Sequence, residues 1–326
     1  MSNIRASDVF GSVFGRFGWF ITAPVVIPLF IYQGIKTTLP AKLKEKFKDI
    51  QAKAVSDAQK RASASPGYYK TSGYSTREVS PANSESNLKI YAASIISEMI
   101  NRGFTYDTAG LAEYQRKMSK LPKILKKIPS VNNLFDITYH NKAFSLKKAL
   151  GDLKGSCQEL SIVTAISLVS QTEKWGFNPS AKKAKIQDKI TSVDDLKFLE
   201  SFPADTKVKL VFGDLIDSAG KPEKHVIIET TYTDPIGTKK TMVIDPALIF
   251  SASSKSAQRL TAAKFCFVKP EIYVTNLHND YGCSFSPSAE IELKKDRPME
   301  NLYRDLYITS RIYPETPNYT YRERKV

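Results

Sequence analysis

GSCQELSIVTAISLV, residues 155–169 of the chain, predicts a buried helix near the centre of the fold. Ser156 and Glu159 match a capping box, in which the first residue caps the helix and the acidic residue lies three positions later. Apolar residues then occupy nearly every face through Val169, a pattern that surface helices lack. We therefore expect a helix that begins at Cys157 and packs against other elements on all sides.

Cys157 lies in the first turn of this predicted helix. The unpaired backbone N–H groups at a helix N-terminus favour a thiolate over a thiol, so we expect raised nucleophilicity at neutral pH. A buried structural cysteine is the alternative, because most free cysteines are of that kind. A base close to Cys157 would favour the interpretation of Cys157 as a reactive nucleophile over that of a structural cysteine.

Three antiparallel strands are predicted downstream, at residues 207–216, 225–232 and 239–245, which are rich in Val, Ile, Thr and Tyr. The turn sequences DSAG (217–220) and DPIG (234–237) separate them. If the second hairpin closes symmetrically about Pro235, His225 faces Asp245 across the strands. A slip of one residue would instead place the two side chains on opposite faces of the sheet.

Cys157, His225 and Asp245 are therefore the candidate catalytic residues. At cross-strand distance, the Asp245 carboxylate can accept the imidazole N–H and fix the tautomer whose other nitrogen faces the thiol. This is the nucleophile, base and orienter arrangement of covalent catalysis.

The remaining histidines and cysteines are weaker candidates. His140 and His278 lie in polar stretches and are expected at the surface. Cys266 belongs to the alternating stretch FCFV, which is typical of a packed strand, and Cys283 follows Gly282 with no predicted helix start or base beside it. Three scattered cysteines exclude a disulfide framework and a zinc site of two cysteine pairs, and no metal or cofactor is expected.

The order of these motifs resembles the transglutaminase-like branch of the papain-like superfamily. A cysteine opens a buried helix, a later strand begins HVIIE (225–229), and the next strand ends VIDPAL (243–248). The last motif resembles in particular the bacterial protein-glutaminase group, the protein glutamine deamidases, which includes secreted effectors and toxins. The similarity spans residues 151–270.

The resemblance implies an α+β, papain-like or transglutaminase-like domain in which the helix bearing Cys157 packs on an antiparallel sheet. It implies Cys157 as nucleophile, His225 as general base and then acid, and Asp245 as orienter. The substrate would be a glutamine side chain of a protein, hydrolysed through a thioester. Papain-like proteases and transglutaminases form the same intermediate and remain alternatives. The backbone N–H of Cys157 is the first choice of oxyanion donor.

One stretch departs from the family pattern. Residues 175–205, between the cysteine and the histidine, are rich in lysine, and they are expected to form a substrate-recognition insert.

The N-terminal part of the chain suggests a membrane surface. Residues 17–35 carry no formal charge. In the next segment apolar residues recur at helical spacing while lysines occupy the other faces, which predicts a basic amphipathic helix. The apolar residues are Leu43, Phe47, Ile50, Ala54 and Ala58, and the lysines are Lys42, Lys44, Lys46, Lys48 and Lys53. We expect a membrane-seeking arm at residues 1–62 that contacts an anionic surface. The alternative is a helix packed on the main domain beside a buried apolar segment. A secretory signal peptide is a third interpretation, weakened because no clean small-x-small cleavage site follows.

The predicted organisation is this arm, a linker at residues 63–87, a catalytic domain at 88–275 and a strap or tail at 276–326. The helical lobe of the domain covers residues 88–170 and the sheet lobe residues 205–275. The chain has a net charge of +15, but no phosphate loop or aromatic-basic RNA motif, so no nucleic acid is expected. By family analogy we expect a bacterial protein secreted into a host cell, membrane-associated or cytoplasmic. A non-enzymatic, membrane-docked binding module is the hypothesis from another class.

Overall fold

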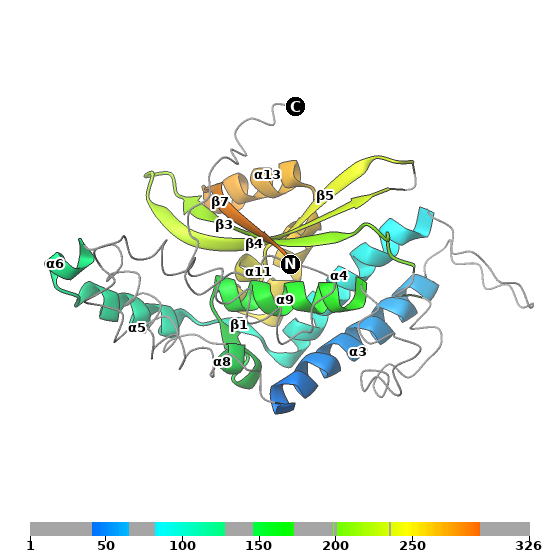
Figure 1. The fold of residues 1–326 in the computed structure, drawn as a ribbon, viewed down its shortest axis with the longest axis horizontal. Helices are drawn as coiled ribbons and strands as arrows, with labels where there is room; N and C mark the ends of the chain where they lie inside the picture. The colour runs from blue at the N-terminus through cyan, green and yellow to red at the C-terminus, as the bar shows by residue number, and fades with distance from the viewer. Residues whose placement is uncertain are drawn as a thin grey trace, which may run out of the picture.

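The computed structural model describes residues 41–64, 82–127, 146–172, 198, 201–234 and 236–293. The apolar segment at residues 17–35, His140, most of the insert at 175–205 and the chain beyond residue 293 lie outside these ranges. The described elements combine helices with an antiparallel sheet, which is an α+β arrangement (Figure 1).

Five strands form the larger sheet of the described residues, in the order β6-β5-β4-β3-β7, and every neighbouring pair is antiparallel. The strands are β3 (Lys207–Ile216), β4 (Pro222–Thr233), β5 (Lys239–Ile244), β6 (Cys266–Val268) and β7 (Ser284–Glu292). The three strands predicted from the sequence are confirmed as β3, β4 and β5. Gly220 and Gly237 have positive φ in the two turns between them, a conformation that glycine adopts without steric cost.

The register of the second hairpin differs from the prediction. Ile228 faces Ile244 and Thr233 faces Lys239, so the hairpin is centred on Ile236, one residue later than the sequence analysis assumed. Asp234 closes this turn, because its side chain accepts hydrogen bonds from the backbone N–H groups of Ile236 and Thr238. His225 and Asp245 are consequently not directly opposite each other.

Helix α9 (Cys157–Thr172) begins at the predicted residue and lies against β3 and β4 (Figure 1). Both the backbone N–H and the hydroxyl of Ser156 donate to the Glu159 carboxylate, so Glu159 supplies its half of the predicted cap. Six apolar side chains between residues 160 and 168 of the helix have at most 1% of their surface exposed: Leu160, Ile162, Val163, Ala165, Ile166 and Leu168. The prediction of a buried central helix is confirmed.

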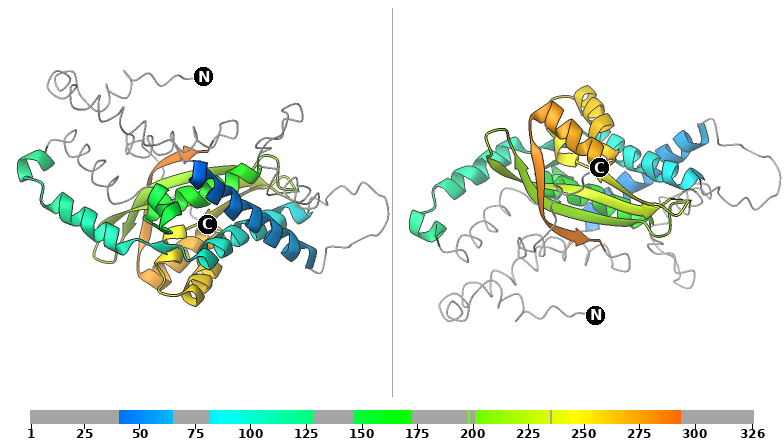
Figure 2. Two further views of the ribbon diagram at one scale, coloured as in Figure 1. Left: turned by 90° about the horizontal axis from the view of Figure 1, so that it is seen from below. Right: turned by 90° about the horizontal axis from the view of Figure 1, so that it is seen from above.

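Helices α3 (Ala41–Ala64) and α4 (Ala82–Arg102) lie side by side in both views of Figure 2. Phe47 and Ile50 of α3 are buried in the same core as α4 and α9, and Ala54 and Ala58 continue this buried face. The apolar face that was expected to seek a membrane is therefore covered by protein, which corresponds to the packed-helix alternative. Burial against α4 removes this apolar surface from water without lipid.

Polar contacts also hold α3 in place. Arg102 at the end of α4 donates to Asp49 at 2.6 Å, and Lys46 Nζ donates to the backbone oxygen of Leu150 at 2.9 Å. Leu150 belongs to α8 (Leu146–Gly151). No helix within the described ranges combines the length and apolar character that crossing a membrane requires.

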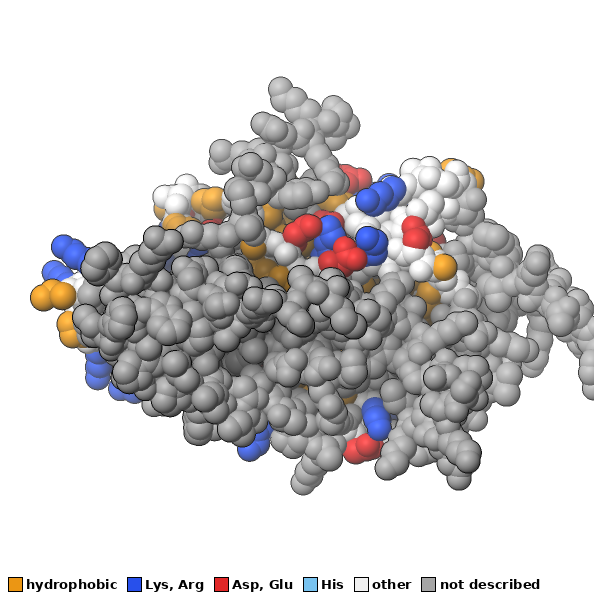
Figure 3. Space-filling view, in the orientation of Figure 1, with side chains coloured by type: hydrophobic (Ala, Val, Ile, Leu, Met, Phe, Trp, Pro, Cys, Tyr) orange, Lys and Arg blue, Asp and Glu red, His pale blue; other side chains and the backbone are white. Residues whose placement is uncertain are grey.

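Helix α4 begins at Ala82, six residues before the expected end of the linker and start of the catalytic domain, and it ends at Arg102, followed by Gly103 at a φ of 88°. The chain continues through β1 (Thr105–Tyr106), α5 (Thr108–Ser119) and α6 (Lys123–Lys126). Helices α5 and α6 extend away from the sheet (Figure 1), and basic and apolar side chains are visible at that end of the molecule in Figure 3.

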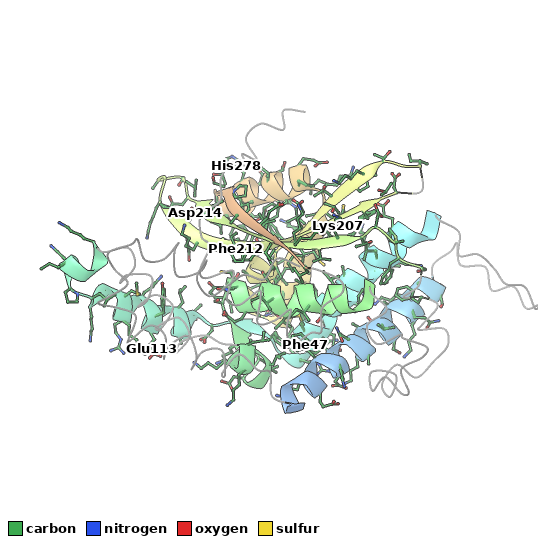
Figure 4. The ribbon with its side chains drawn as sticks, in the orientation of Figure 1. Phe47, Glu113, Lys207, Phe212, Asp214 and His278 are labelled. Atoms are coloured by element: carbon green, nitrogen blue, oxygen red, sulfur yellow. The ribbon has the colours of Figure 1, made fainter. Side chains whose placement is uncertain are left out.

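Three further helices follow β5: α11 (Pro246–Ser251), α12 (Lys255–Phe265) and α13 (Pro270–Tyr281). Strand β7 then pairs with β3 along its length, and ion pairs of Lys207 with Glu292 and Lys209 with Glu290 join the two strands. Acidic and basic side chains lie next to one another on this part of the surface in Figure 3; Lys207 is labelled in Figure 4.

Candidate active site

The first two turns of α9 place Cys157 beside the backbone of His225. The Cys157 thiol lies 3.9 Å from the carbonyl oxygen of Lys224, to which it donates. One turn later, the Ser161 hydroxyl donates to the carbonyl oxygen of Val226 at 3.0 Å. The helix therefore contacts the strand on both sides of the histidine, and its N-terminus cannot shift along β4 without breaking these contacts.

Strand β5 pairs with β4 only from Ile228 onward, so it does not pair with the part of β4 that α9 contacts. Beyond Ile244 the chain leaves the sheet and enters α11 through Asp245 and Pro246. Proline suits the first position of a helix, since its fixed φ matches and no N–H is needed there. The sequence therefore ends β5 just before Asp245, which places the carboxylate at the junction of β5 and α11.

His225 and Asp245 form a buried pair, with 2.7 Å between Nε2 of the imidazole and Oδ2 of the carboxylate. His225 is 6% exposed and Asp245 is fully buried. The contact forms although the register is shifted. A shift by one residue at the hairpin centre moves each pairing by two positions, so every residue of the hairpin keeps its face of the sheet. Beyond the last pair, Ile228 with Ile244, Asp245 reaches His225 from the end of β5.

Asp245 is held by two further donors. Its Oδ1 accepts the backbone N–H of Leu248 at 3.1 Å, as the N-cap of α11, and its Oδ2 accepts the Tyr273 hydroxyl at 3.0 Å. A carboxylate in this position is an acceptor only, so Nε2 of His225 carries a proton and donates it. In the neutral form of this imidazole, the other nitrogen, Nδ1, keeps its lone pair and is available as a base.

Packing around His225 depends on Gly213 and Phe285. The Phe285 ring meets the imidazole edge-to-face, with 6.1 Å between the centroids. Gly213 is paired directly opposite His225, and a Cβ there would lie 2.4 Å from the backbone oxygen of Ser286 and 2.7 Å from the Phe285 ring. The absence of a side chain at Gly213 therefore lets Phe285 reach the histidine.

The electrostatics at Cys157 differ from the expectation. Burial raises the pKa of this thiol to about 12, and the charges of Glu159 and Asp245 raise it further. A backbone hydrogen bond from Gln158 at the helix start acts in the opposite direction and is outweighed. Cys157 is thus a thiol in the free protein, and a base must remove its proton before it can act as a nucleophile.

The three predicted residues are therefore brought into one cluster, and the other candidates lie elsewhere. His278 is exposed on α13, as expected (Figure 4), while His140 lies outside the described residues. Cys266 forms the start of β6, where burial raises its pKa to about 12. Cys283 directly precedes β7 and donates to the backbone oxygen of Tyr281.

Sequence reasoning missed three residues that shape this cluster: Gly213, Tyr273 and Phe285. Tyr273 and Leu277 repeat at helical spacing after Pro270, which signals the buried face of a helix but not a contact with Asp245. Gly213 interrupts a predicted strand, and a glycine in that position often marks the close approach of another group.

Comparison of the chain with models of known protein families, with curated proteins and with solved structures gave no match. The motif resemblance therefore stays a hypothesis, and the geometry of the cluster is the independent observation that bears on function.

Proposed function

We propose that this protein is a cysteine-dependent amidohydrolase of the papain-like, transglutaminase-like type, and that it deamidates glutamine side chains of a protein substrate. The single observation that carries the proposal is the hydrogen bond of Asp245 to Nε2 of His225, next to a cysteine at a helix N-terminus. This bond leaves Nδ1 unprotonated in a buried setting, where it can accept the proton of Cys157.

The first half of the reaction forms a thioester. Nδ1 of His225 takes the proton from the Cys157 thiol while the sulfur attacks the amide carbon. The tetrahedral intermediate collapses when the imidazolium returns that proton to the leaving nitrogen, so the C–N bond breaks and ammonia departs. Asp245 stays ionised and stabilises the imidazolium, as an orienting carboxylate does.

The second half regenerates the thiol. Water enters, His225 removes one of its protons, and the resulting hydroxide attacks the thioester carbon. The C–S bond breaks, the sulfur takes the proton back from the imidazolium, and the former glutamine leaves as glutamate. Each half of the reaction returns His225 to its starting tautomer.

The raised pKa of Cys157 fits this sequence of steps. A thiol whose pKa is about 12 is almost fully protonated at neutral pH, so attack requires base assistance in the same step. The proposal therefore makes His225 essential for nucleophilic attack.

One sequence feature supports glutamine as the substrate. The VIDPAL motif at residues 243–248 resembles the protein-glutaminase group, and in this structure it forms the end of β5 and the start of α11, with Asp245 at the junction. Effectors and toxins occur in that group, so a host-cell protein is the class of substrate proposed.

The test is mass spectrometry of a host-cell lysate incubated with the wild-type protein in heavy-oxygen water. We expect glutamines converted to glutamates that carry heavy oxygen, with no conversion by Cys157→Ala and normal conversion by Cys266→Ala. New peptide termini would instead identify a protease, and glutamine–lysine cross-links a transglutaminase. Identical lysates with wild type and Cys157→Ala would overturn the enzymatic proposal and favour a binding module.

A further inference from the structure

Helix α5 starts beside the backbone that leads into Cys157. Strand β1 pairs in parallel with β2 (Lys154–Gly155), which ends two residues before Cys157. The backbone N–H of Asp107 donates to the carbonyl oxygen of Gly155 at 3.0 Å, and the Asp107 side chain accepts the backbone N–H of Gly110 at 2.9 Å as the N-cap of α5. Asp107 therefore ties the start of α5 to the strand that precedes the candidate nucleophile.

From this start, α5 leads away from the candidate site. Helices α5 and α6 project away from the sheet in Figures 1 and 2. Helix α5 has 12 residues, and at the usual rise of an α-helix its far end lies about 18 Å from its start. A ligand bound at that far end would thus remain within reach of Cys157 through a short stretch of extended chain.

The far end of this projection is basic. Residues 116–127, which we call the basic projection, contain six basic residues and no acidic one. Lys120, Lys123 and Lys127 are exposed, and no ion pair joins them to an acidic side chain within the described ranges. Basic side chains are visible at this end of the molecule in Figure 3. Their charge is therefore presented to solvent.

The lysines of the sheet are arranged differently. Lys207 pairs with Glu292, Lys209 with Glu290 and Lys224 with Asp214, so that each cation has a carboxylate beside it. Such pairs offer little net charge to a partner. A run of cations without carboxylates instead creates a positive potential, which raises the local concentration of an anionic partner.

The apolar residues of the projecting helix favour a protein partner over a lipid surface. Leu111, Tyr114 and Met118 recur at helical spacing and are half-buried, and Leu121 is buried. A helix that lies in a membrane interface instead places an exposed apolar face in the lipid. Ile124, at 75% exposure, is the one large apolar side chain that the described part of the basic projection presents to water.

We propose that the basic projection docks an acidic segment of the protein substrate whose glutamine reaches Cys157. This inference rests on the proposed function and narrows its substrate class to proteins that carry an acidic segment near the modified glutamine. An extended chain advances about 3.3 Å per residue, so about six substrate residues span the length of α5.

Synthetic peptides of matched length test this docking surface. Each carries one glutamine and a glycine–serine spacer of about six residues, followed by a block of glutamates in the acidic peptide and a block of serines in the neutral one. A second pair has the reverse order, so that both chain directions are covered. Ammonia release gives kcat and KM, and fluorescence anisotropy of the labelled peptides gives Kd for the inactive Cys157→Ala protein.

The variant Lys120→Glu/Lys123→Glu/Lys127→Glu reverses the charge of the basic projection. We expect KM and Kd of the acidic peptide to rise by about tenfold or more, while those of the neutral peptide stay the same. About 1 M salt should remove the wild-type preference for the acidic peptide, because it shortens the screening distance to about 3 Å.

The matched control is Lys60→Glu/Lys89→Glu/Lys239→Glu, which changes the net charge equally at exposed lysines of α3, α4 and β5. It should alter KM and Kd of the acidic peptide by less than about twofold. Acylation of Cys157 by 4-nitrophenyl acetate should proceed at the wild-type rate in both triple variants, because this small ester does not extend to the basic projection.

Two results would overturn the inference. One is equal binding of the acidic and neutral peptides by the wild type, or a loss of preference in the control as large as in the projection variant. The other is binding of phosphatidylserine vesicles in place of the acidic peptide, lost in the projection variant, since the surface would then be a lipid-binding one.

Failure of the proposed function would look different. If no peptide releases ammonia, while anisotropy shows the preference for the acidic peptide and its loss in the projection variant, the deamidase proposal fails and the basic projection still docks acidic segments. Release of ammonia from acidic and neutral peptides with equal KM refutes only the docking surface.

Discussion

Among single residues, Asp245 connects three elements around the candidate site. Its carboxylate accepts hydrogen bonds from a side chain of β4, a side chain of α13 and the backbone of α11, and it is fully buried. A buried charge is tolerated only when its lone pairs are satisfied, so these three contacts explain why an aspartate can occupy the interior. The same contacts fix the direction in which it presents an oxygen to His225.

Asp245→Asn should fold but lose nearly all activity. The asparagine oxygen can still cap α11, while its NH₂ group would face Nε2 of His225 and donate to it. The proton then moves to Nδ1, which can no longer accept the proton of Cys157. We expect the rate at which 4-nitrophenyl acetate acylates Cys157 to fall by about 10³-fold or more. The free energy of unfolding, measured in urea, should fall by about 1–3 kcal/mol.

Asp234→Asn is the matched control for this variant, because Asp234 is also a buried aspartate that caps a turn of the same hairpin. Asp234→Asn should lower the free energy of unfolding but leave the acylation rate of Cys157 unchanged. Turnover of Asp245→Asn at the wild-type rate would contradict the role of the carboxylate as orienter.

Glu159 is the second residue whose charge can be tested. It raises the pKa of Cys157, so its removal lowers that pKa and increases the thiolate fraction at any given pH below it. Glu159→Gln keeps an acceptor for Ser156 and removes only the charge. We expect the curve of alkylation rate against pH to move to lower pH, measured with iodoacetamide, and Glu113→Gln on α5 to leave it in place. A shift to higher pH would show that loss of the cap dominates.

At the scale of elements, three adjacent strands cooperate to place one imidazole. Strand β3 contributes Gly213 opposite His225 of β4, and β7 contributes Phe285 across Gly213. The pairing of β3 with β7 shifts register between Phe212 and Gly213, which locally changes how β7 lies over the strand. The N-terminus of helix α9 then adds Cys157 to the site.

Gly213→Ala should therefore disturb the site without touching any catalytic group. The new Cβ collides with backbone as well as with the Phe285 ring, so β7 must move away from β3. We expect the free energy of unfolding to fall by about 1–3 kcal/mol, as for overpacked cores, together with slower acylation of Cys157. Gly151→Ala is the control, because a Cβ there meets no atom within 4 Å. Equal behaviour of the two variants in urea unfolding and acylation would show that Phe285 does not position His225.

At the scale of the whole molecule, α3 belongs to the core that supports the site. Its buried face contacts α4, α8 and α9, so the helix that carries Cys157 is backed by a segment more than 90 residues earlier in the chain. Helix α3 was interpreted from sequence as part of a membrane-seeking arm. In the structure its apolar face stabilises the protein, and its exposed lysines lie on the solvent side.

Phe47→Ala tests this position of α3 (Figure 4). Phe47 is fully buried, so its truncation leaves a cavity between α3 and the rest of the core. We expect a loss of about 3–5 kcal/mol in the free energy of unfolding, measured in urea. Lys53→Ala on the exposed side of the same helix should change it by less than about 0.5 kcal/mol. Similar small effects of both variants would mean that α3 does not unfold cooperatively with the rest of the core.

The sequence alone determined the features that depend on neighbouring residues. The helix start at Cys157 follows from Ser156 and Glu159, and the strand boundaries and turns follow from β-branched runs interrupted by glycine and aspartate. These are short-range effects, because a cap or a turn is formed by residues within four positions of one another.

Only the tertiary structure decided what distant segments do to each other. It brought His225 to Asp245 through a register that the turn sequence did not specify, and it brought Tyr273 and Phe285 to the same place from two other elements. It also raised the pKa of Cys157, which the helix start alone would have lowered. The physical reason is that burial and the charges surrounding a group depend on the whole packed molecule, whereas capping and turn formation act within a few residues.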